Sequence, residues 1–220
     1  AKGIPVLGSG RIFPVPEEDI VCDAIRDKDI PAYWKRLGAM DFGWDHPFAA
    51  VELLWDVDAD CVYVSRLFRR REMSPVLAAA ALKPWGAELP WMWPRDGRRD
   101  TQEGAGVALA KQFTAQGLKM HMTHAQFPDG SVSVEAGLMD MLDRMQTGRL
   151  RVFRGLSEWL EEFRIYHRED GKVVKEMDDL MAATRYGVMM LRCARIMKEL
   201  QPKDKYRRDR NKPAGSAWSV

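Results

Sequence analysis

Acidic residues recur in this sequence at the expected ends of strands and at the start of a helix. Asp41 follows the apolar segment "RLGAM", Asp96 follows "LPWMWP", and the pair Asp178 and Asp179 precedes a helical pattern. Carboxylates from separate segments are the ligands that a hard divalent cation such as Mg2+ needs. Two such ions about 3.5–4 Å apart can activate a water molecule and stabilise the leaving oxygen of a phosphodiester. The spacing is not specific by itself, because acids are common at strand ends and helix starts.

The periodicity of the last helical segment separates its two neighbouring aspartates. Apolar residues there recur at three- and four-residue spacing and define a core-facing stripe: Leu180, Ala183, Gly187, Met190, Ala194 and Met197. At roughly 100° per residue, Asp179 lies about 40° from the centre of this stripe and Asp178 about 140° away. A core-facing carboxylate needs a partner, and a metal ion is one solution. We therefore expect Asp179 to be the better metal ligand and Asp178 to be an N-cap that accepts backbone N–H groups.

Basic residues cluster beside these acids and suggest contact with phosphate. The clusters are Arg69, Arg70 and Arg71 after one strand-like segment, and Arg95, Arg98 and Arg99 around Asp96. Contacts of this kind are independent of base sequence and predict weak, salt-sensitive binding of DNA. The alternative interpretation is a solvated surface that favours solubility. His46 is expected to hydrogen-bond a nearby carboxylate or backbone group, in preference to contacting phosphate.

Length and composition exclude several classes of protein. The 220 residues fit one domain, and a net charge of +2 argues against a molecule that is polybasic throughout. The 3 cysteines form no CxxC pair, which disfavours a zinc ribbon or disulfide framework and favours a reducing compartment. No apolar run approaches the roughly 18 residues of a membrane span. Nucleotide-binding motifs of the P-loop and dinucleotide-binding types are absent from the sequence.

The elements that must position the acids predict an α/β fold, a mixed sheet with helices on both faces. Beyond Asp41, the segments "FAAVELLWD" and "VYVSRLFRR" read as antiparallel strands joined by a short acidic turn. Helical and strand patterns then alternate, which favours a parallel portion of the sheet. The expected helices are 74–86, with Ser74 as N-cap, 103–117, 132–148 and 156–169, and the expected strands are 89–94, 118–122 and 149–153. A hairpin-like turn at 169–174 and a long helix from about Asp178 to Leu200 complete the pattern.

Six strings occur in order along the chain: "GIPVLGSGRIFPV", "DFGWDHPFAA", "WPRDG", "FPDGSVSVEAG", "EEFRIYHREDGKVVK" and "DDLMAATRYGVMM". Together they resemble the C-terminal nuclease domain of the large terminase subunit of tailed double-stranded DNA bacteriophages, most closely the headful-packaging group. The resemblance runs from the first residues to about residue 195. It implies an RNase H-like fold and a metal-dependent endonuclease that cuts concatemeric phage DNA in the cytoplasm of the infected bacterial host.

The resemblance also implies a role for each acid. Asp41 would hold two divalent ions, Mg2+ or Mn2+, while Asp96 and Asp179 would each hold one, and all three would be catalytic. Asp178 and Glu103 are further candidate metal ligands, so the candidate metal set is Asp41, Asp96, Asp178, Asp179 and Glu103. Relatives often carry another Asp just before "ATRY", where this chain has Ala182. That departure leaves open a different function, a catalytically weak docking module that binds DNA or the portal.

The resemblance further suggests how the chain is organised. Residues 1–30 read as a Gly- and Pro-rich connector from a missing N-terminal ATPase domain, since no Walker motif is present. Residues 31–200 would form the nuclease domain, and residues 201–220 a basic tail that we expect to be disordered. The implied partners are double-stranded DNA, the portal protein, the small terminase subunit and the ATPase domain of the same polypeptide. A transposase or resolvase with the same fold is disfavoured by the "GIPVLGSGRIF" and "ATRYG" strings.

Overall fold

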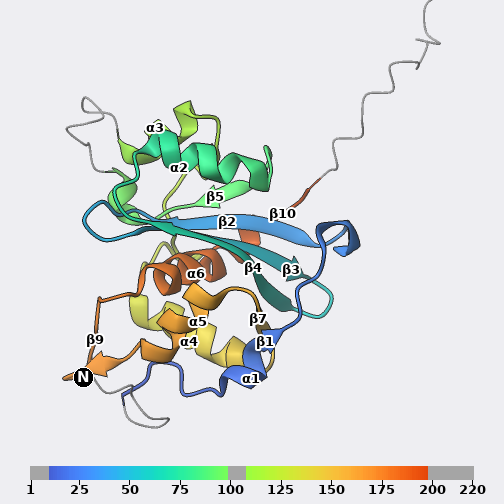
Figure 1. Ribbon diagram of the computed structural model, residues 1–220, viewed down its shortest axis with the longest axis vertical. Helices are drawn as coiled ribbons and strands as arrows, with labels where there is room; N and C mark the ends of the chain where they lie inside the picture. The colour runs from blue at the N-terminus through green and yellow to red at the C-terminus, as the bar shows by residue number, and fades with distance from the viewer. Residues whose placement is uncertain (1–9, 99–107, 198–220) are drawn as a thin grey trace, which may run out of the picture.

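The computed structural model describes residues 10–98 and 108–197. Its helices are α1 Glu17–Ile20, α2 Pro75–Leu82, α3 Leu109–Ala115, α4 Val134–Gln146, α5 Ser157–Ile165 and α6 Asp179–Met189. Its strands are β1 Val21–Cys22, β2 Lys35–Asp41, β3 Phe48–Asp56, β4 Cys61–Arg70, β5 Pro90–Met92, β6 Lys119–Met120, β7 Leu150–Phe153, β8 Arg168–Glu169, β9 Lys172–Val173 and β10 Arg195–Ile196. Helices lie on both faces of a central sheet, as the sequence predicts (Figure 1).

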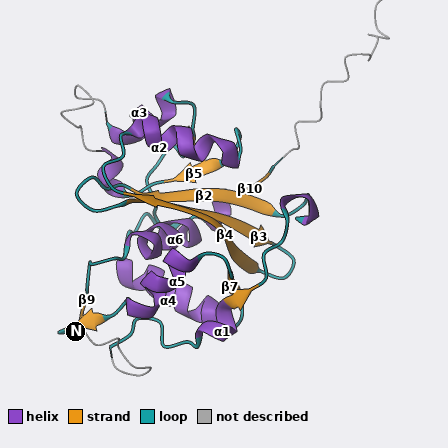
Figure 2. Ribbon diagram, in the orientation of Figure 1, coloured by secondary structure: helices purple, strands orange, loops and turns teal. Residues whose placement is uncertain are grey.

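The central sheet combines antiparallel and parallel pairs. Its strand order is β1-β7-β4-β3-β2-β5-β6, with β10 paired to β2 outside this path. The pairs β2–β3 and β3–β4 are antiparallel, while β4–β7, β1–β7, β2–β5 and β5–β6 are parallel. The expected antiparallel meander and parallel portion are therefore confirmed. Figure 2 shows the sheet edge-on, between α2 and α3 on one side and α4, α5 and α6 on the other.

Alternation along the long strands divides the apolar residues between two cores. Ala39 and Val51 face the cluster that includes α4, α5 and α6, whereas Met40, Phe48 and Ala50 face the cluster that includes α2 and α3. Because successive strand residues point to opposite faces, the mostly apolar β3 supplies both clusters. Trp91 and Trp93, two residues apart on and just after β5, are both buried in the second cluster.

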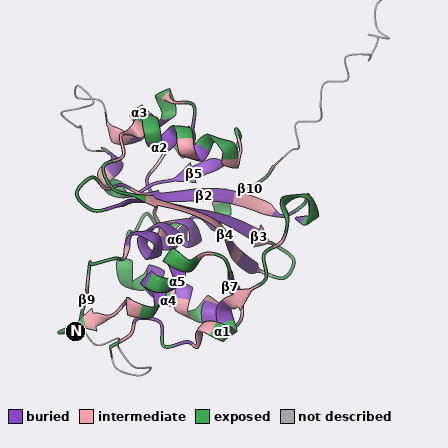
Figure 3. Cartoon of the chain, viewed as in Figure 1, coloured by how far each residue is buried: buried purple, intermediate pink, exposed green. Residues whose placement is uncertain are grey.

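Helix α6 packs closely on the sheet and is buried along most of its length (Figure 3). Gly187 allows this approach, since a Cβ atom there would lie 2.5 Å from Cδ1 of Leu53. A larger residue would push the helix away from β2 and β3. The start of α6, with Asp179, is thereby fixed relative to the end of β2, with Asp41.

The end of α6 differs from the prediction. The expected helix to Leu200 was wrong: α6 ends at Met189, and Arg195–Ile196 form β10. This strand pairs with Arg36 and Lys35 at the start of β2. Strand β5 pairs with β2 only at Gly38 and Ala39, so the start of β2 has unpaired backbone groups on that side. Pairing these backbone groups with a strand stabilises the fold more than further turns of helix α6 would.

The opening residues contribute to the same fold. Phe13 and Ile20 are fully buried in the larger core cluster, and β1 pairs in parallel with β7. The described part of the segment expected as a connector, residues 10–30, therefore packs onto the domain. The expected Ser74 N-cap is confirmed, because its Oγ accepts the N–H of Leu77 at 3.4 Å. None of the helices in the described ranges has the length and apolar character that a membrane crossing needs.

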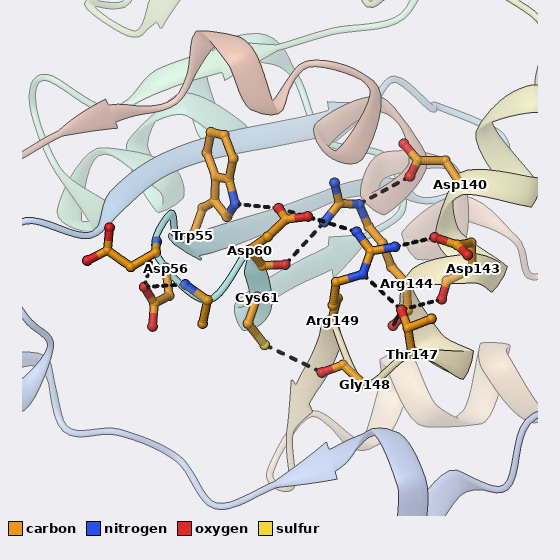
Figure 4. A network of polar contacts seen from close by, with 12 residues as sticks. Trp55, Asp56, Asp60, Cys61, Asp140, Asp143, Arg144, Thr147, Gly148 and Arg149 are labelled. Carbon is orange, nitrogen blue, oxygen red and sulfur yellow. Dashed lines mark hydrogen bonds and ion pairs between the residues drawn. The ribbon is translucent and has the colours of Figure 1, made fainter.

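A polar network around Asp60 fixes the turn between β3 and β4 (Figure 4). Its carboxylate accepts hydrogen bonds from Trp55 Nε1 at 3.1 Å, from Arg144 Nη1 at 3.2 Å and from Arg149 Nη1 at 2.7 Å. Arg144 lies on α4 and Arg149 precedes β7, so the network joins this turn to the crossover between them. It lies at the opposite end of β3 from Ala49, the residue that pairs with Asp41.

Candidate functional site

The four described acids singled out in the sequence line one pocket of about 630 Å³. Asp41 is the last residue of β2, and Asp96 lies in the 3-10 segment Arg95–Arg98 just after β5. Because β2 and β5 are neighbouring parallel strands, their carboxyl ends meet at the same edge of the sheet. Asp178 and Asp179 reach this edge from the start of α6.

Burial and mutual repulsion raise the pKa values of two acids in this group. Burial and the negative charges of Asp96, Asp179 and Asp178 raise the pKa of Asp41 well above the ordinary range of an aspartate. Burial, followed by the charge of Asp179, also raises the pKa of Asp178. A divalent cation would relieve this repulsion, and carboxylate oxygens are the donors that Mg2+ and Mn2+ prefer. The donor set therefore fits a hard divalent ion.

The carboxylates line the pocket without forming a finished metal cage. Within residues 10–98 and 108–197, no three His, Cys, Asp or Glu side chains are already arranged to hold one metal ion. Both oxygens of Asp179 are instead engaged by protein partners. The pocket therefore suits a metal ion because its donors are carboxylate oxygens with negative charge.

Asp179 is held from two sides by basic side chains. It is buried, as its place on the helical wheel predicts, with 4% of its surface exposed. Its Oδ1 lies 3.0 Å from Nδ1 of His46, and its Oδ2 lies 3.5 Å from Nη2 of Arg69. The expected hydrogen bond from His46 to a carboxylate is confirmed. These contacts orient the carboxylate that begins α6.

Glu162 of α5 has a structural role that the sequence analysis did not assign. Its side chain is fully buried, and its Oε2 accepts the backbone N–H groups of Leu180 at 2.8 Å and Met181 at 3.2 Å. Its Oε1 lies 3.0 Å from Nε of Arg69. The available signal was its spacing, since Glu162 falls three residues after the core residue Trp159 of the same helix.

The prediction that Asp178 caps α6 through its side chain was wrong. Asp178 occupies the N-cap position but makes no capping hydrogen bond with its side chain. Glu162 accepts the amide hydrogens instead, because its helix packs across the start of α6 and delivers a carboxylate from outside the segment. The Asp178 carboxylate turns to the pocket with the other acids.

The three consecutive arginines divide between two faces, because Arg69 and Arg71 both line the pocket and Arg70 does not. Arg69 pairs with Ala49 and Arg70 with Phe48 across the β3–β4 ladder, so their side chains point to opposite faces. Arg69 is enclosed by its ion pairs with Glu162 and Asp179, and so braces the site. Arg70 is exposed on the other face, and Arg71 is exposed and lines the pocket.

The second basic cluster is described only in part. Arg95 is exposed and does not line the pocket of the four acids. The backbone of Arg98 lies in the 3-10 segment, and its side chain is outside what the structure describes. The predictions for Arg99 and Glu103 fall outside the described residues.

Two further residues of α6 line the pocket and were not singled out as site residues in the sequence, Arg185 and Tyr186. Ala182, where relatives often have an acid, also lines it and is buried. The 3.6-residue period places Ala182 and Arg185 on the helix face that follows Asp178. Helix α6 thus presents an acid, a small residue and a cation to the same space.

Comparison with known proteins gives concordant results. A family model for the terminase RNaseH-like domain matches residues 38–191. The large terminase subunit of Salmonella phage P22 is 45% identical over 207 residues, which cover 93% of this chain and 41% of that protein. The chain therefore spans about two fifths of the length of this curated relative.

Solved structures agree with this match. The nuclease domain of the P22 large terminase superposes with a TM-score of 0.80 and 43% identity, covering 90% of this chain and 100% of that one. The large-terminase nuclease domain of bacteriophage SPP1, solved with bound Mn, has a TM-score of 0.57 at 18% identity, covering 81% of this chain and 99% of that one, and shares the fold. On the family match and the shared fold, this chain belongs to the terminase RNaseH-like domain family.

Proposed function

We propose that this chain is the metal-dependent endonuclease of a phage DNA-packaging terminase and hydrolyses phosphodiester bonds of double-stranded DNA. The observation that carries the proposal is the meeting of Asp41, Asp96, Asp178 and Asp179 at one pocket from three separate elements. The likeness to the P22 nuclease domain, at 43% identity over its whole length, supports this assignment.

The same four carboxylates would hold two divalent ions, Mg2+ or Mn2+, and Glu103 is a further candidate ligand. Bound there, the ions would activate a water molecule and neutralise charge on the leaving oxygen. The donor chemistry and the raised pKa of Asp41 support a hard cation at this place. The Mn bound by the SPP1 domain is in keeping with that choice.

The protein's own residues divide the remaining tasks. Asp41, Asp96 and Asp179 are the proposed catalytic acids, and His46 and Arg69 keep Asp179 in one orientation. Arg71, which lines the pocket, would contact the DNA backbone without reading bases. Arg95, which directly precedes Asp96 in the sequence, would do the same. Water attacks the phosphorus in line with the leaving oxygen, so no covalent bond to the protein forms.

The biological setting is also a proposal, drawn from the P22 large subunit of which the chain covers 41%. An ATPase domain of the same polypeptide would move the DNA, and the portal protein and small terminase subunit would be the other partners. Cleavage of concatemeric DNA at the start and end of packaging, in the cytoplasm of the infected host, would be the physiological reaction.

Plasmid cleavage tests the proposed activity. Supercoiled plasmid is incubated with the wild type in Mn2+, in Mg2+ and in EDTA, and with the variants Asp41→Ala, Asp96→Ala and Asp179→Ala. We expect nicking and linearisation that need a divalent ion and that each variant loses by a factor of about 100 or more. Asp58→Asn, an exposed acid in the β3–β4 turn, is the matched control and should cut normally.

A wild type that binds DNA yet cuts in neither metal would contradict the proposed activity. It would favour the alternative of a module that docks on DNA or on the portal. Cutting that persists in all three alanine variants would place the active site elsewhere.

A further inference from the structure

Arg185 is a buried cation inside the acidic pocket. Only 6% of its surface is exposed, and it lines the same space as Asp41 and Asp178. Among the described residues, no carboxylate lies within ion-pair distance of its guanidinium, although Arg69 on the other side of the pocket has two such partners. Its Nε donates to no acceptor in the described part of the chain. Its Nη1 lies 3.8 Å from the sulfur of Met189, and its side chain also hydrogen-bonds Tyr186. Its positive charge acts on Asp41 and Asp178 from beyond ion-pair distance and opposes the rise of their pKa values.

The surrounding residues hold this side chain in place. Its guanidinium carbon lies 4.5 Å from the centre of the Tyr186 ring. Its aliphatic stem occupies a cradle left by Gly137 of α4, where a Cβ atom would come within 2.7 Å of Cγ and 2.9 Å of Cδ of Arg185. The geometry therefore depends on the absence of a side chain at residue 137.

A guanidinium that is buried without a carboxylate in ion-pair contact is costly, and the buried Nε–H of Arg185 has no acceptor among the described residues. Structural arginines in interiors are ordinarily paired, so the donors here suit a ligand that arrives from outside the chain. The planar guanidinium matches two oxygens of a phosphate group better than any other side chain does. The exposed Arg71 lines the same pocket, so a DNA strand held there would lie within the same space as Arg185.

We propose that Arg185 binds the non-bridging oxygens of a DNA phosphodiester inside the pocket and stabilises the charge that builds on them during hydrolysis. The inference rests on the proposed function and adds a catalytic residue to it. Exposed arginines such as Arg71 act on encounter and affinity, where salt screens them. Arg185 is preorganised and shielded from water, so its effect belongs to the chemical step.

Single-turnover cleavage at saturating DNA and Mn2+ tests this role. Arg185→Met removes the charge at similar volume, and we expect the rate to fall by about 100-fold. Arg185→Lys keeps a charge without the planar fork and should recover part of that loss. Arg154→Met, which removes an exposed arginine paired with Asp23, is the control. A folded Arg185→Met protein that cuts at the wild-type rate would overturn the proposal.

The glycine cradle supplies a variant that removes no polar atom. Gly137→Ala should displace Arg185 and lower the rate, whereas Gly155→Ala, with no atom within 4 Å of its added Cβ, should not. The double variant Gly137→Ala with Arg185→Met should be no slower than Arg185→Met alone, because both act through one side chain. If Arg185→Met fails to fold, wild-type rates in both Arg185→Lys and Gly137→Ala overturn the proposal.

A binding measurement separates this inference from the proposed function. The Nε–H resonance of Arg185, assigned by its absence from Arg185→Lys, is followed in the Asp41→Asn protein as a short DNA duplex is added in Mg2+. A shift that saturates with the duplex supports phosphate contact, and an unchanged resonance under saturating DNA overturns it. A wild type that cuts in no metal would count against the proposed activity, and this titration would still decide the role of Arg185.

Discussion

Nε of Arg69 lies 3.0 Å from Oε1 of the buried Glu162, a contact that joins β4 to α5, and the same arginine also contacts Asp179. The pair links the sheet to the start of α6, since Glu162 also accepts two amide hydrogens of that helix. One carboxylate thus fixes the arginine and the helix that together position an acid of the pocket.

Glu162 should make stability depend on pH. Burial raises its pKa from 4.5 to about 8, against the opposing charge of Arg69. Because the folded-state pKa lies above the unfolded one, the stability from protonated Glu162 is full below about pH 4.5 and is lost as pH rises through about 8. Glu162→Gln cannot titrate, so its free energy of unfolding relative to wild type should rise by about 2 kcal/mol between about pH 6 and pH 9.

Urea unfolding at the two pH values measures this difference. Glu161→Gln removes an exposed acid on the same helix and should show no such change. Parallel pH profiles for wild type and Glu162→Gln would mean that Glu162 keeps its charge state across the range.

Asp41→Asn should stabilise the protein when metal is absent. Burial of Asp41, followed by repulsion from Asp96, Asp179 and Asp178, raises its pKa and costs folding energy whenever the carboxylate is ionised. Removing it in EDTA should add about 1 kcal/mol, or roughly 2–4 °C in Tm for a chain of this size. Addition of Mn2+ should raise the Tm of the wild type and leave that of Asp41→Asn nearly unchanged. Equal Mn2+ shifts in the two proteins would exclude Asp41 as a ligand.

Ala182→Asp should make stability depend more strongly on metal. The new carboxylate would enter a buried position in the pocket beside four acids, which should cost about 2 kcal/mol in EDTA. A divalent ion would offset this charge, so the Tm difference from wild type should shrink in Mn2+. Ala182→Asn has the same size without charge and separates packing from electrostatics. A loss in Ala182→Asp that Mn2+ leaves untouched would show that residue 182 does not face the metal.

Asp60→Asn should destabilise the protein at neutral pH and not in acid. Burial opposes ionisation of Asp60, but hydrogen bonds and charge from Arg149 and Arg144 prevail and lower its pKa. A depressed folded-state pKa gives stability that is present above about pH 4 and is lost as pH falls through the folded value. Since the side chain is partly exposed, the loss should not exceed about 1 kcal/mol.

Asparagine is chosen at residue 60 because the backbone there has a φ of +47°, which Asn tolerates. Denaturant unfolding at about pH 7 and pH 3 gives the comparison. Asp58→Asn, in the same turn and exposed, is the control. An equal loss at both pH values would assign the effect to the backbone.

Local patterns in the sequence were sufficient for much of the fold. Strand β3 runs over Phe48–Asp56, the residues that its apolar run predicts, and Ser74 caps α2 as its place before Pro75 predicts. Asp41 ends β2 as expected, because an apolar run followed by an acid and a glycine is a local signal. The core-facing position of Asp179 followed from helical periodicity in the same way.

Only the tertiary structure decided how the ends of α6 are satisfied and which arginines serve the site. Glu162 replaces Asp178 as the cap of α6, and β10 replaces the last turns that the helical pattern predicts. Arg69 turns inward to Glu162, and Arg185 fits a cradle at Gly137. Each outcome depends on partners far away in the chain. A period of two or 3.6 residues specifies which face a residue occupies, whereas the packing of other elements specifies what it meets there.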